Sequence, residues 1–190
     1  MIKVLIVNGY ETLDQGEAKL SNSISLLSKQ LFLDKGYEVK TTIVEQGYSS
    51  QVEYEKFDWA DKILIHFPVY WFAVPGLFKT YLDTILLPHK FFLNDGRSRK
   101  DPSKKYGSGG LMKSKKYMLC STWNAPKTAF GPEDELFQGK SVDDVLISTH
   151  LAMQFCGLTQ IESFHFHDVF KGDLLTQQVK EFEEHIKVVF

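Results

Sequence analysis

The chain of 190 residues is 43% hydrophobic, 24% charged and 14% aromatic, and its formal net charge is −2. This length fits one domain, residues 1–190, and the near-neutral charge excludes the strong field that draws nucleic acid or anionic membranes to a protein. The N-terminus has no signal-peptide pattern and no apolar run approaches the roughly 18 residues that cross a bilayer, so we expect a cytoplasmic protein that does not insert into membranes.

Short apolar runs alternate along the chain with longer amphipathic ones, which is typical of a parallel sheet covered by helices on both faces. The sequence first predicts a buried strand over 2–7, an amphipathic helix over 20–35, a more polar strand over 38–44, a short helix over 52–59 and a buried strand over 62–67. It then predicts a helix over 76–86, a fourth strand over 116–121, a helix over 141–156, a fifth strand over 159–166 and a final helix over 175–189. Residues 87–115 form a long, polar, glycine-rich loop, and such loops are usually functional or mobile.

Five strands joined by right-handed crossovers fit the order 2-1-3-4-5, so we expect an α/β, flavodoxin-like, doubly wound parallel sheet with helices on both faces. Sheets of this kind bind ligands at the carboxyl ends of their strands, beside the switch point between strands one and three. The loops that matter for function are therefore those after Val7, Phe67 and Ser121.

Metal and disulfide chemistry have little support in the sequence. Cys120 and Cys156 sit in apolar segments without CxxC spacing, so we expect buried thiols in a reducing compartment. His165 and His167 alternate along the fifth predicted strand, but no third ligand stands near them in sequence. We therefore expect no metal site.

The first functional loop, residues 8–19, leads into a helix that starts Leu20-Ser21-Asn22-Ser23. Hydroxyl groups and free backbone N–H groups at a helix N-terminus attract anions, so a phosphate or pyrophosphate would fit there. The loop contains neither GxGxxG nor a P-loop pattern, which argues against a Rossmann dinucleotide domain and against an NTPase. The alternative is that Ser21 and Ser23 are solvated helix residues.

The second and third loops carry aromatic and polar side chains. Residues 67–75 read FPVYWFAVP, which places three rings at the mouth of the crevice, where they cover either a flat isoalloxazine or the protein's own core. Residues 122–126 read TWNAP, and their side-chain and backbone groups would suit the polar edge of a flavin ring. Because all three loops converge at one edge of one sheet, they predict a flavin site.

Longer stretches of the sequence carry a specific resemblance. The motifs are IVNG at 6–9, WAD at 59–61, PxxWxxxP at 68–75, DGR at 95–97, RKDPSKKYGSGGL at 99–111, KKYML at 115–119 and TWNAP at 122–126. They resemble the modulator of drug activity B (MdaB) family of NAD(P)H:quinone oxidoreductases, within the flavodoxin-like quinone reductases. The similarity runs from Ile2 to the final helix.

This resemblance implies an FAD-dependent homodimer that reduces quinones by two electrons, with NADPH or NADH as donor and FMN as the less favoured flavin. We expect the two substrates to use one place in turn, in a ping-pong cycle. The family's FAD-phosphate segment aligns with Gly16, Glu17, Ala18, Lys19, Leu20, Ser21, Asn22 and Ser23. Its isoalloxazine-side segment aligns with Pro68, Val69, Tyr70 and Trp71, and its ring-edge segment with Thr122, Trp123, Asn124 and Ala125. A flavin-contacting tyrosine aligns with Tyr106 and a histidine with His150, and these two are the catalytic candidates.

The chain departs from the family at positions that bear on catalysis. The first loop has QGEA at 15–18 where the family often has HSNG, although Lys19 offers a positive charge. Gln138 stands where near relatives have histidine, and Phe130 aligns with the wider group's catalytic tyrosine. We therefore expect no tyrosine–histidine proton relay, and water or Tyr106 would supply protons.

Several plain alternatives stay open. His150 is either a core or interface histidine or part of a quinone pocket. The basic group at 97–105 is either a solvated loop or a site for a pyridine-nucleotide phosphate. At the level of function, the alternatives are a one-electron flavodoxin carrier, a flavin-binding regulatory module and a broad azo- or nitro-compound reductase. Carriers are usually strongly acidic, whereas this chain is nearly neutral with a long inserted loop, so we favour the enzyme.

Overall fold

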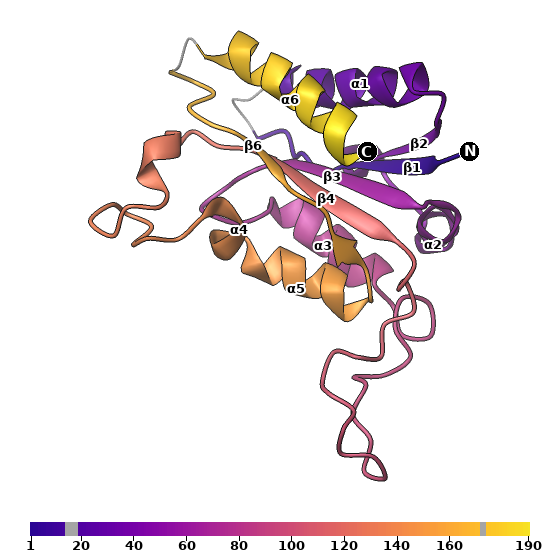
Figure 1. The fold of residues 1–190 in the computed structure, drawn as a ribbon. Coiled ribbons are helices and arrows are strands. Elements are labelled where there is room, and N and C mark those ends of the chain that lie inside the picture. The colour runs from indigo at the N-terminus through magenta and orange to yellow at the C-terminus, as the bar shows by residue number, and fades with distance from the viewer. Residues whose placement is uncertain (14–18, 172–173) are drawn as a thin grey trace.

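The computed structural model of the protein describes residues 1–13, 19–171 and 174–190. Its centre is a parallel sheet in the order β2-β1-β3-β4-β5, in which β6 also pairs with β4 (Figure 1). The strands are β1 (Lys3–Asn8), β2 (Glu38–Ile43), β3 (Lys62–Pro68), β4 (Lys116–Thr122), β5 (Thr159–Gln160) and β6 (Phe164–Phe166). The order expected from the sequence is confirmed, with β1 and β3 side by side at the switch point.

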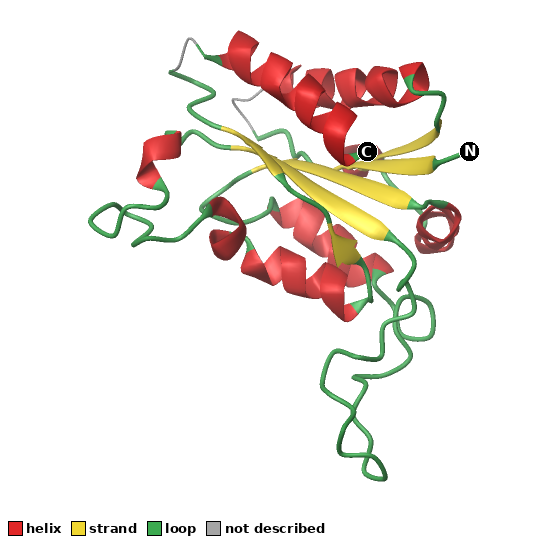
Figure 2. Ribbon diagram, in the orientation of Figure 1, coloured by secondary structure: helices red, strands yellow, loops and turns green. Residues whose placement is uncertain are grey.

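Helices cover both faces of the sheet, as Figure 2 shows in red around the yellow strands. The helices are α1 (Lys19–Asp34), α2 (Ser50–Trp59), α3 (Gly76–Ile85), α4 (Val142–Val145), α5 (Ile147–Phe155) and α6 (Leu175–Val189), with short 3-10 turns η1 (Val44–Gln46) and η2 (Lys127–Ala129). Helices α1 and α6 pack on one face, and α2, α3 and α5 on the other (Figure 1).

The alternation of side chains along the strands explains the two cores. In β3, Ile63 and Ile65 face α2, α3 and α5, whereas Leu64 faces α1 and α6. Helix α6 is held on its face by Phe182 and Ile186, which are fully buried. Burial of each such side chain stabilises the fold by about 1.5–3 kcal/mol.

Two expected elements are interrupted in the structure. In the predicted fifth strand, Gln160 pairs with Tyr117 and Phe164 pairs with Cys120. The two pairs are four residues apart in the predicted strand but only three residues apart in β4. The extra residue forms a bulge that separates β5 from β6. The predicted helix over 141–156 is likewise divided at Leu146 into α4 and α5.

The segment at 87–115 projects from the body of the molecule as a long series of turns, which we call the excursion (Figure 2). It joins the end of α3 to the start of β4, so it leaves from the amino edge of the sheet. A Cβ on Gly110 would lie 2.3 Å from the backbone nitrogen of Gly157, so only glycine allows the excursion to pack there. Across the described ranges, no helix has the length and apolar character to cross a membrane.

Candidate functional site

The loops after β1, β3 and β4 meet at the carboxyl edge of the sheet around a cavity of about 490 Å3, which we call the edge cavity. Their meeting follows from the strand register, because parallel neighbours end at one edge and Pro68 pairs with Thr122. The volume falls within the range of roughly 300–1,000 Å3 that is usual for small-molecule sites. The lining residues are Tyr10, Glu11, Thr12, Leu13, Leu20, Ser21, Pro68, Val69, Tyr70, Thr122, Asn124, Val169 and Phe170.

The first loop begins at a glycine that the packing requires. A Cβ on Gly9 would lie 2.4 Å from the ring of Phe78, so only glycine lets β1 end against α3. Further along, Thr12 donates through its backbone N–H and its hydroxyl to the Glu45 carboxylate, at 2.6 and 3.0 Å. These contacts fix the described part of the loop beside the edge cavity.

The second loop turns sharply between Tyr70 and Ala73. The backbone N–H of each donates to the carbonyl of the other, at 3.0 and 3.1 Å, and the two residues between them, Trp71 and Phe72, have φ of 49° and 66°. This left-handed conformation costs bulky side chains of order 1–3 kcal/mol each. Trp71 is 92% exposed at the tip of the turn, whereas Tyr70 lines the cavity, where burial and nearby carboxylates raise its pKa.

The third loop divides its side chains between two environments. Thr122 and Asn124 line the cavity, and neither side chain makes a hydrogen bond within the described ranges. Trp123, in contrast to our expectation, keeps its side chain out of the cavity. It is 2% exposed and packs edge-on against Phe130, with ring centroids 5.1 Å apart, on the face of β4 that α3 and α5 cover. Ala125 packs on the same side.

The expected phosphate segment is only partly present at the cavity. Leu20 and Ser21, in the first turn of α1, line its wall. Asn22 is half-buried, and Lys19 and Ser23 are exposed on the same turn without lining the cavity. The rest of that segment, Gly16, Glu17 and Ala18, lies outside the described residues.

Tyr106 does not line the edge cavity of its own chain, so its expected contact with a flavin is not observed within one protomer. Its ring is 69% exposed on the excursion, with the Phe155 ring centroid 5.5 Å away and the Arg97 guanidinium 5.6 Å from its centroid. The reason is topological: the excursion precedes β4, so it lies at the opposite edge of the sheet from the loop that follows β4. The basic residues at 97–105 share this position.

His150 also lies outside the edge cavity, so its expected place in the wall of that pocket is not observed. It is 1% exposed and sits in α5, with Nδ1 2.8 Å from the hydroxyl oxygen of Tyr117. Its Nε2 lies 3.1 Å from Oδ1 of Asp143. His150 is therefore a core histidine, which is one of the two alternatives left open by the sequence. Its ring nitrogens contact the side chains of Tyr117 and Asp143.

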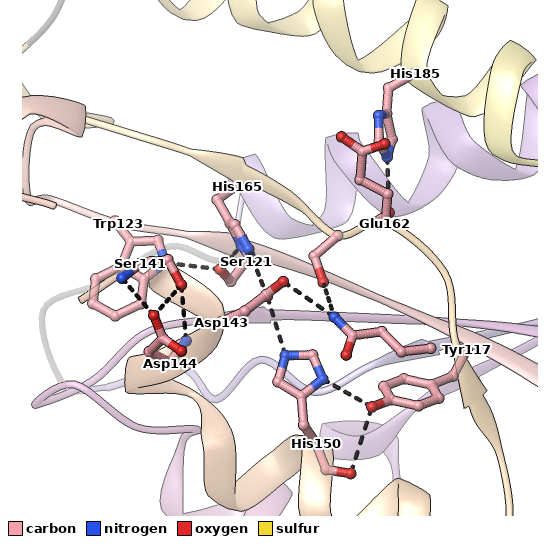
Figure 3. Close-up of polar contacts among 12 residues, drawn as sticks. Tyr117, Ser121, Trp123, Ser141, Asp143, Asp144, His150, Glu162, His165 and His185 are labelled. Carbon is pink, nitrogen blue, oxygen red and sulfur yellow. Dashed lines mark hydrogen bonds and ion pairs between the residues drawn. The ribbon is translucent and has the colours of Figure 1, made fainter. Parts of the chain in front are cut away.

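Sequence reasoning missed a polar cluster behind the third loop, shown in Figure 3, which we call the Asp143 cluster. It comprises Tyr117, Ser121, Trp123, Asp143, His150, Gln160 and His165. Burial alone would raise the pKa of Asp143, but hydrogen bonds from two imidazoles hold that pKa well below its usual range. The one sequence signal was the alternation of His165 with two phenylalanines along the fifth predicted strand.

Comparison with known proteins gives consistent matches. A family model described as a flavodoxin-like fold matches residues 6–188. The NADPH:quinone oxidoreductase MdaB of Haemophilus influenzae is 33% identical over 191 aligned residues, which cover 100% of both chains. A candidate quinone reductase from Klebsiella pneumoniae has a TM-score of 0.74 at 17% identity, covering 98% of this chain and 84% of its own. General stress protein 14 of Treponema denticola, solved with FMN, has a TM-score of 0.64 at 19% identity, covering 98% and 96%. The two solved structures bear on the fold alone.

Proposed function

The chain belongs to the family of flavodoxin-like proteins that includes the MdaB NADPH:quinone oxidoreductase, and from that premise we propose that it reduces quinones with electrons from NADPH through FAD bound in the edge cavity. It is a quinone-reducing oxidoreductase. The main support for this location of the site is that three loops converge on one cavity beside the switch point of the sheet.

The donor set around the edge cavity suits a flavin. The hydroxyl of Thr122 and the amide of Asn124 face the cavity with no other partner in the described ranges, as the polar edge of an isoalloxazine requires. Tyr70 offers an aromatic wall, worth about 0.5–1.5 kcal/mol beyond area burial. Ser21 lines the cavity near the start of α1, where a phosphate would be stabilised by the helix dipole. When bound, the flavin supplies two-electron redox chemistry that the side chains themselves lack.

FAD is our choice of flavin because the motifs resemble a family that uses it. FMN is the competing assignment, since it is the flavin in the Treponema denticola structure of similar fold. Denaturing the purified protein and identifying the released chromophore by mass spectrometry separates the two. Release of FMN alone would overturn the assignment of FAD while leaving quinone reduction intact.

We propose a ping-pong order, in which NADPH or NADH leaves the edge cavity before a quinone enters the same place. A quinone is flat and apolar with two carbonyl oxygens, so aromatic walls with few donors suit it. Phe170 lines the cavity and Trp71 follows the cavity residue Tyr70 in the chain, and both rings are largely exposed, so we propose that they cover either planar substrate. Parallel double-reciprocal plots for the two substrates would support this order, and intersecting plots would contradict it.

A homodimer would complete the site. Tyr106 is exposed on an excursion that leads away from its own edge cavity, so it can contact a flavin only if that flavin is bound to another subunit. We propose that Tyr106 of the partner subunit borders each cavity, and that the basic residues of the same excursion approach the pyridine nucleotide. A monomer with full activity would exclude this part of the proposal.

The cytoplasm is the compartment that we propose. Cys120 and Cys156 are free and buried, and burial raises the pKa of both thiols. Unreactive thiols of this kind carry no structural disulfide, which is usual for proteins of a reducing compartment.

Steady-state assay of the purified protein with NADPH and menadione tests the proposal. We expect oxidation of one NADPH per menadione, without accumulation of a flavin semiquinone. A stable flavin semiquinone during partial reduction would instead favour the one-electron carrier. Azo and nitro compounds, offered to the same protein, measure how far the cavity accepts other planar electron acceptors.

A further inference from the structure

Asp143, in the first turn of α4, is connected to the segment that borders the edge cavity (Figure 3). Its Oδ1 lies 3.1 Å from Nε2 of His165. The Nδ1 of His165 lies 2.7 Å from Oγ of Ser121. The indole N–H of Trp123 donates to that same oxygen, also at 2.7 Å. These contacts form a continuous hydrogen-bonded chain from α4, through β6 and β4, to the third loop.

The chemistry of its two ends gives this chain a direction. An indole nitrogen can only donate and a carboxylate can only accept, so Ser121 accepts from Trp123 and Asp143 accepts from Nε2 of His165. In the tautomer that leaves Nδ1 of His165 without a proton, Ser121 donates to that nitrogen, and every polar group in the series has a partner. Ser121 and Trp123 are buried, and a satisfied polar network that is shielded from water fixes the orientation of its members.

A second branch leaves Asp143 in another direction and serves as an internal comparison. Here His150 lies between Asp143 and the hydroxyl of Tyr117, at 3.1 and 2.8 Å. Tyr117 is fully buried in the core that α3 and α5 cover, and it does not line the edge cavity. The two branches share one carboxylate, but only the branch through His165 ends at the third loop.

The branch that ends at Trp123 bears on the cavity because the neighbours of this residue on both sides line it. The backbone of Trp123 is already tied to the edge of the sheet: its N–H donates to Phe166 at 2.8 Å, and its carbonyl accepts from Val169 at 3.1 Å. These bonds hold the segment in place. The indole is held by its hydrogen bond to Ser121. Loss of the hydrogen-bonded chain should therefore change the conformation of the third loop without unfolding it.

We propose that Asp143 is a positioning residue for the edge cavity: the chain that it anchors fixes the indole of Trp123, and so orients the polar side chains on either side of it toward a bound flavin. The inference deepens the proposed function and depends on it for the identity of the ligand, FAD. The hydrogen-bonded chain itself does not depend on any ligand.

Two variants interrupt this series of hydrogen bonds at different points. Ser121→Ala removes the link between His165 and Trp123, and Asp143→Asn removes the carboxylate that accepts from both imidazoles. In the full-length protein, the indole N–H resonance of Trp123 reports the link directly, and Trp59 and Trp71 provide internal references. We expect both variants to shift the Trp123 resonance, to leave that of Trp59 in place, and to raise the Kd for added FAD by about 5- to 30-fold.

Two matched controls separate positioning from general loss of packing. Tyr117→Phe removes the hydroxyl at the end of the other branch, so it should lower Tm without moving the Trp123 resonance or the Kd for FAD. Asp144→Asn makes the same change of charge one residue along α4, where the carboxylate bonds to Ser141. It should leave FAD binding unchanged.

The proposal is overturned if Ser121→Ala leaves the Trp123 resonance unmoved, or if Tyr117→Phe weakens FAD binding as much as Ser121→Ala does. Ser121→Ala removes a single hydroxyl, so the test remains available even if Asp143→Asn misfolds. If the unaltered protein binds neither FAD nor FMN, the proposed function fails, whereas the indole resonance still decides whether Asp143 positions Trp123.

Discussion

The hydroxyl of Tyr70 donates to the backbone carbonyl of Glu11 at 2.8 Å, across a separation of 59 residues in the chain. The bond joins the loop after β3 to the loop after β1, and both residues line the edge cavity. The carboxylate of Glu11 also accepts from the backbone N–H of Leu77 at 3.1 Å, so the first loop is fixed to the start of α3 as well. Glu11 therefore helps to set the width of the cavity.

Tyr70→Phe should lower the stability of the protein by about 0.5–1.5 kcal/mol, because the Glu11 carbonyl loses its donor. FAD binding should weaken as the two loops separate. Urea denaturation and FAD titration measure the two effects. Tyr54→Phe is the matched control, since the Tyr54 hydroxyl has no hydrogen bond within the described ranges. Equal effects of both variants would mean that the bond between the loops has no special role.

Trp71→Asn should leave stability unchanged or raise it by up to about 1 kcal/mol, because asparagine tolerates the left-handed conformation at this position better than tryptophan does. If the exposed indole covers a bound quinone, as we propose, its loss should lower the rate of quinone reduction. Thermal unfolding and menadione turnover measure the two quantities. A variant that is both less stable and fully active would contradict the account of this turn.

Glu53→Ala should destabilise the protein by about 3–5 kcal/mol, because its carboxylate is buried and paired with Lys56 at 2.7 Å. The hydroxyls of Thr42 and Tyr81 would lose the same partner. Glu55→Ala, on the exposed side of the same helix, should cost far less. Urea denaturation of both variants makes the comparison, and a similar cost for the two would contradict the buried network.

Stability should fall as the pH drops from about 6.5 to about 4. Burial lowers the pKa of His66 and His167 from 6.5 to about 4, so in this range the unfolded chain binds more protons than the folded one. The contribution of His66 is fully present above 6.5 and declines by at most about 1.4 kcal/mol per pH unit below it. Urea midpoints at several pH values test this, and the slope should be shallower in His66→Gln.

Subunit mixing tests whether two chains build each site. Asn124→Ala damages the cavity side of the proposed site, and Tyr106→Ala damages the side that the partner would supply. A mixed dimer of the two variants contains one intact site, so random exchange should restore about a quarter of the unaltered activity. Mixtures no more active than the separate variants would exclude a shared site.

The sheet and the position of its cavity could be predicted from sequence because both depend on strong, local signals. The apolar runs at 2–7, 62–67 and 116–121 are long enough to identify central strands, and chain order then determines which loops share an edge. Chain order also bears on Tyr106, since the segment that joins α3 to β4 begins and ends at the edge opposite to the one where β4 ends. The family alignment, which compares sequences without regard to subunits, obscured that point.

The Asp143 cluster could not be predicted in the same way. Asp143 and His165 meet only because the bulge between β5 and β6 and the break at Leu146 set their elements in place. Neither irregularity has a periodic signal in the sequence. The side of the sheet that Trp123 faces could have been predicted from the sequence. Trp123 lies an even number of positions along the chain from Tyr117 and Ser121, and alternate residues along a strand face the same side.

The most direct test of the central claim is titration of the purified, flavin-free protein with FAD and with FMN, followed by visible absorption. We predict that FAD binds at one molecule per subunit with a changed absorption envelope, and that Asn124→Ala weakens this binding. A protein that takes up neither flavin, or one whose uptake is unaffected by changes at Thr122, Asn124 and Tyr70, would contradict the assignment of the edge cavity.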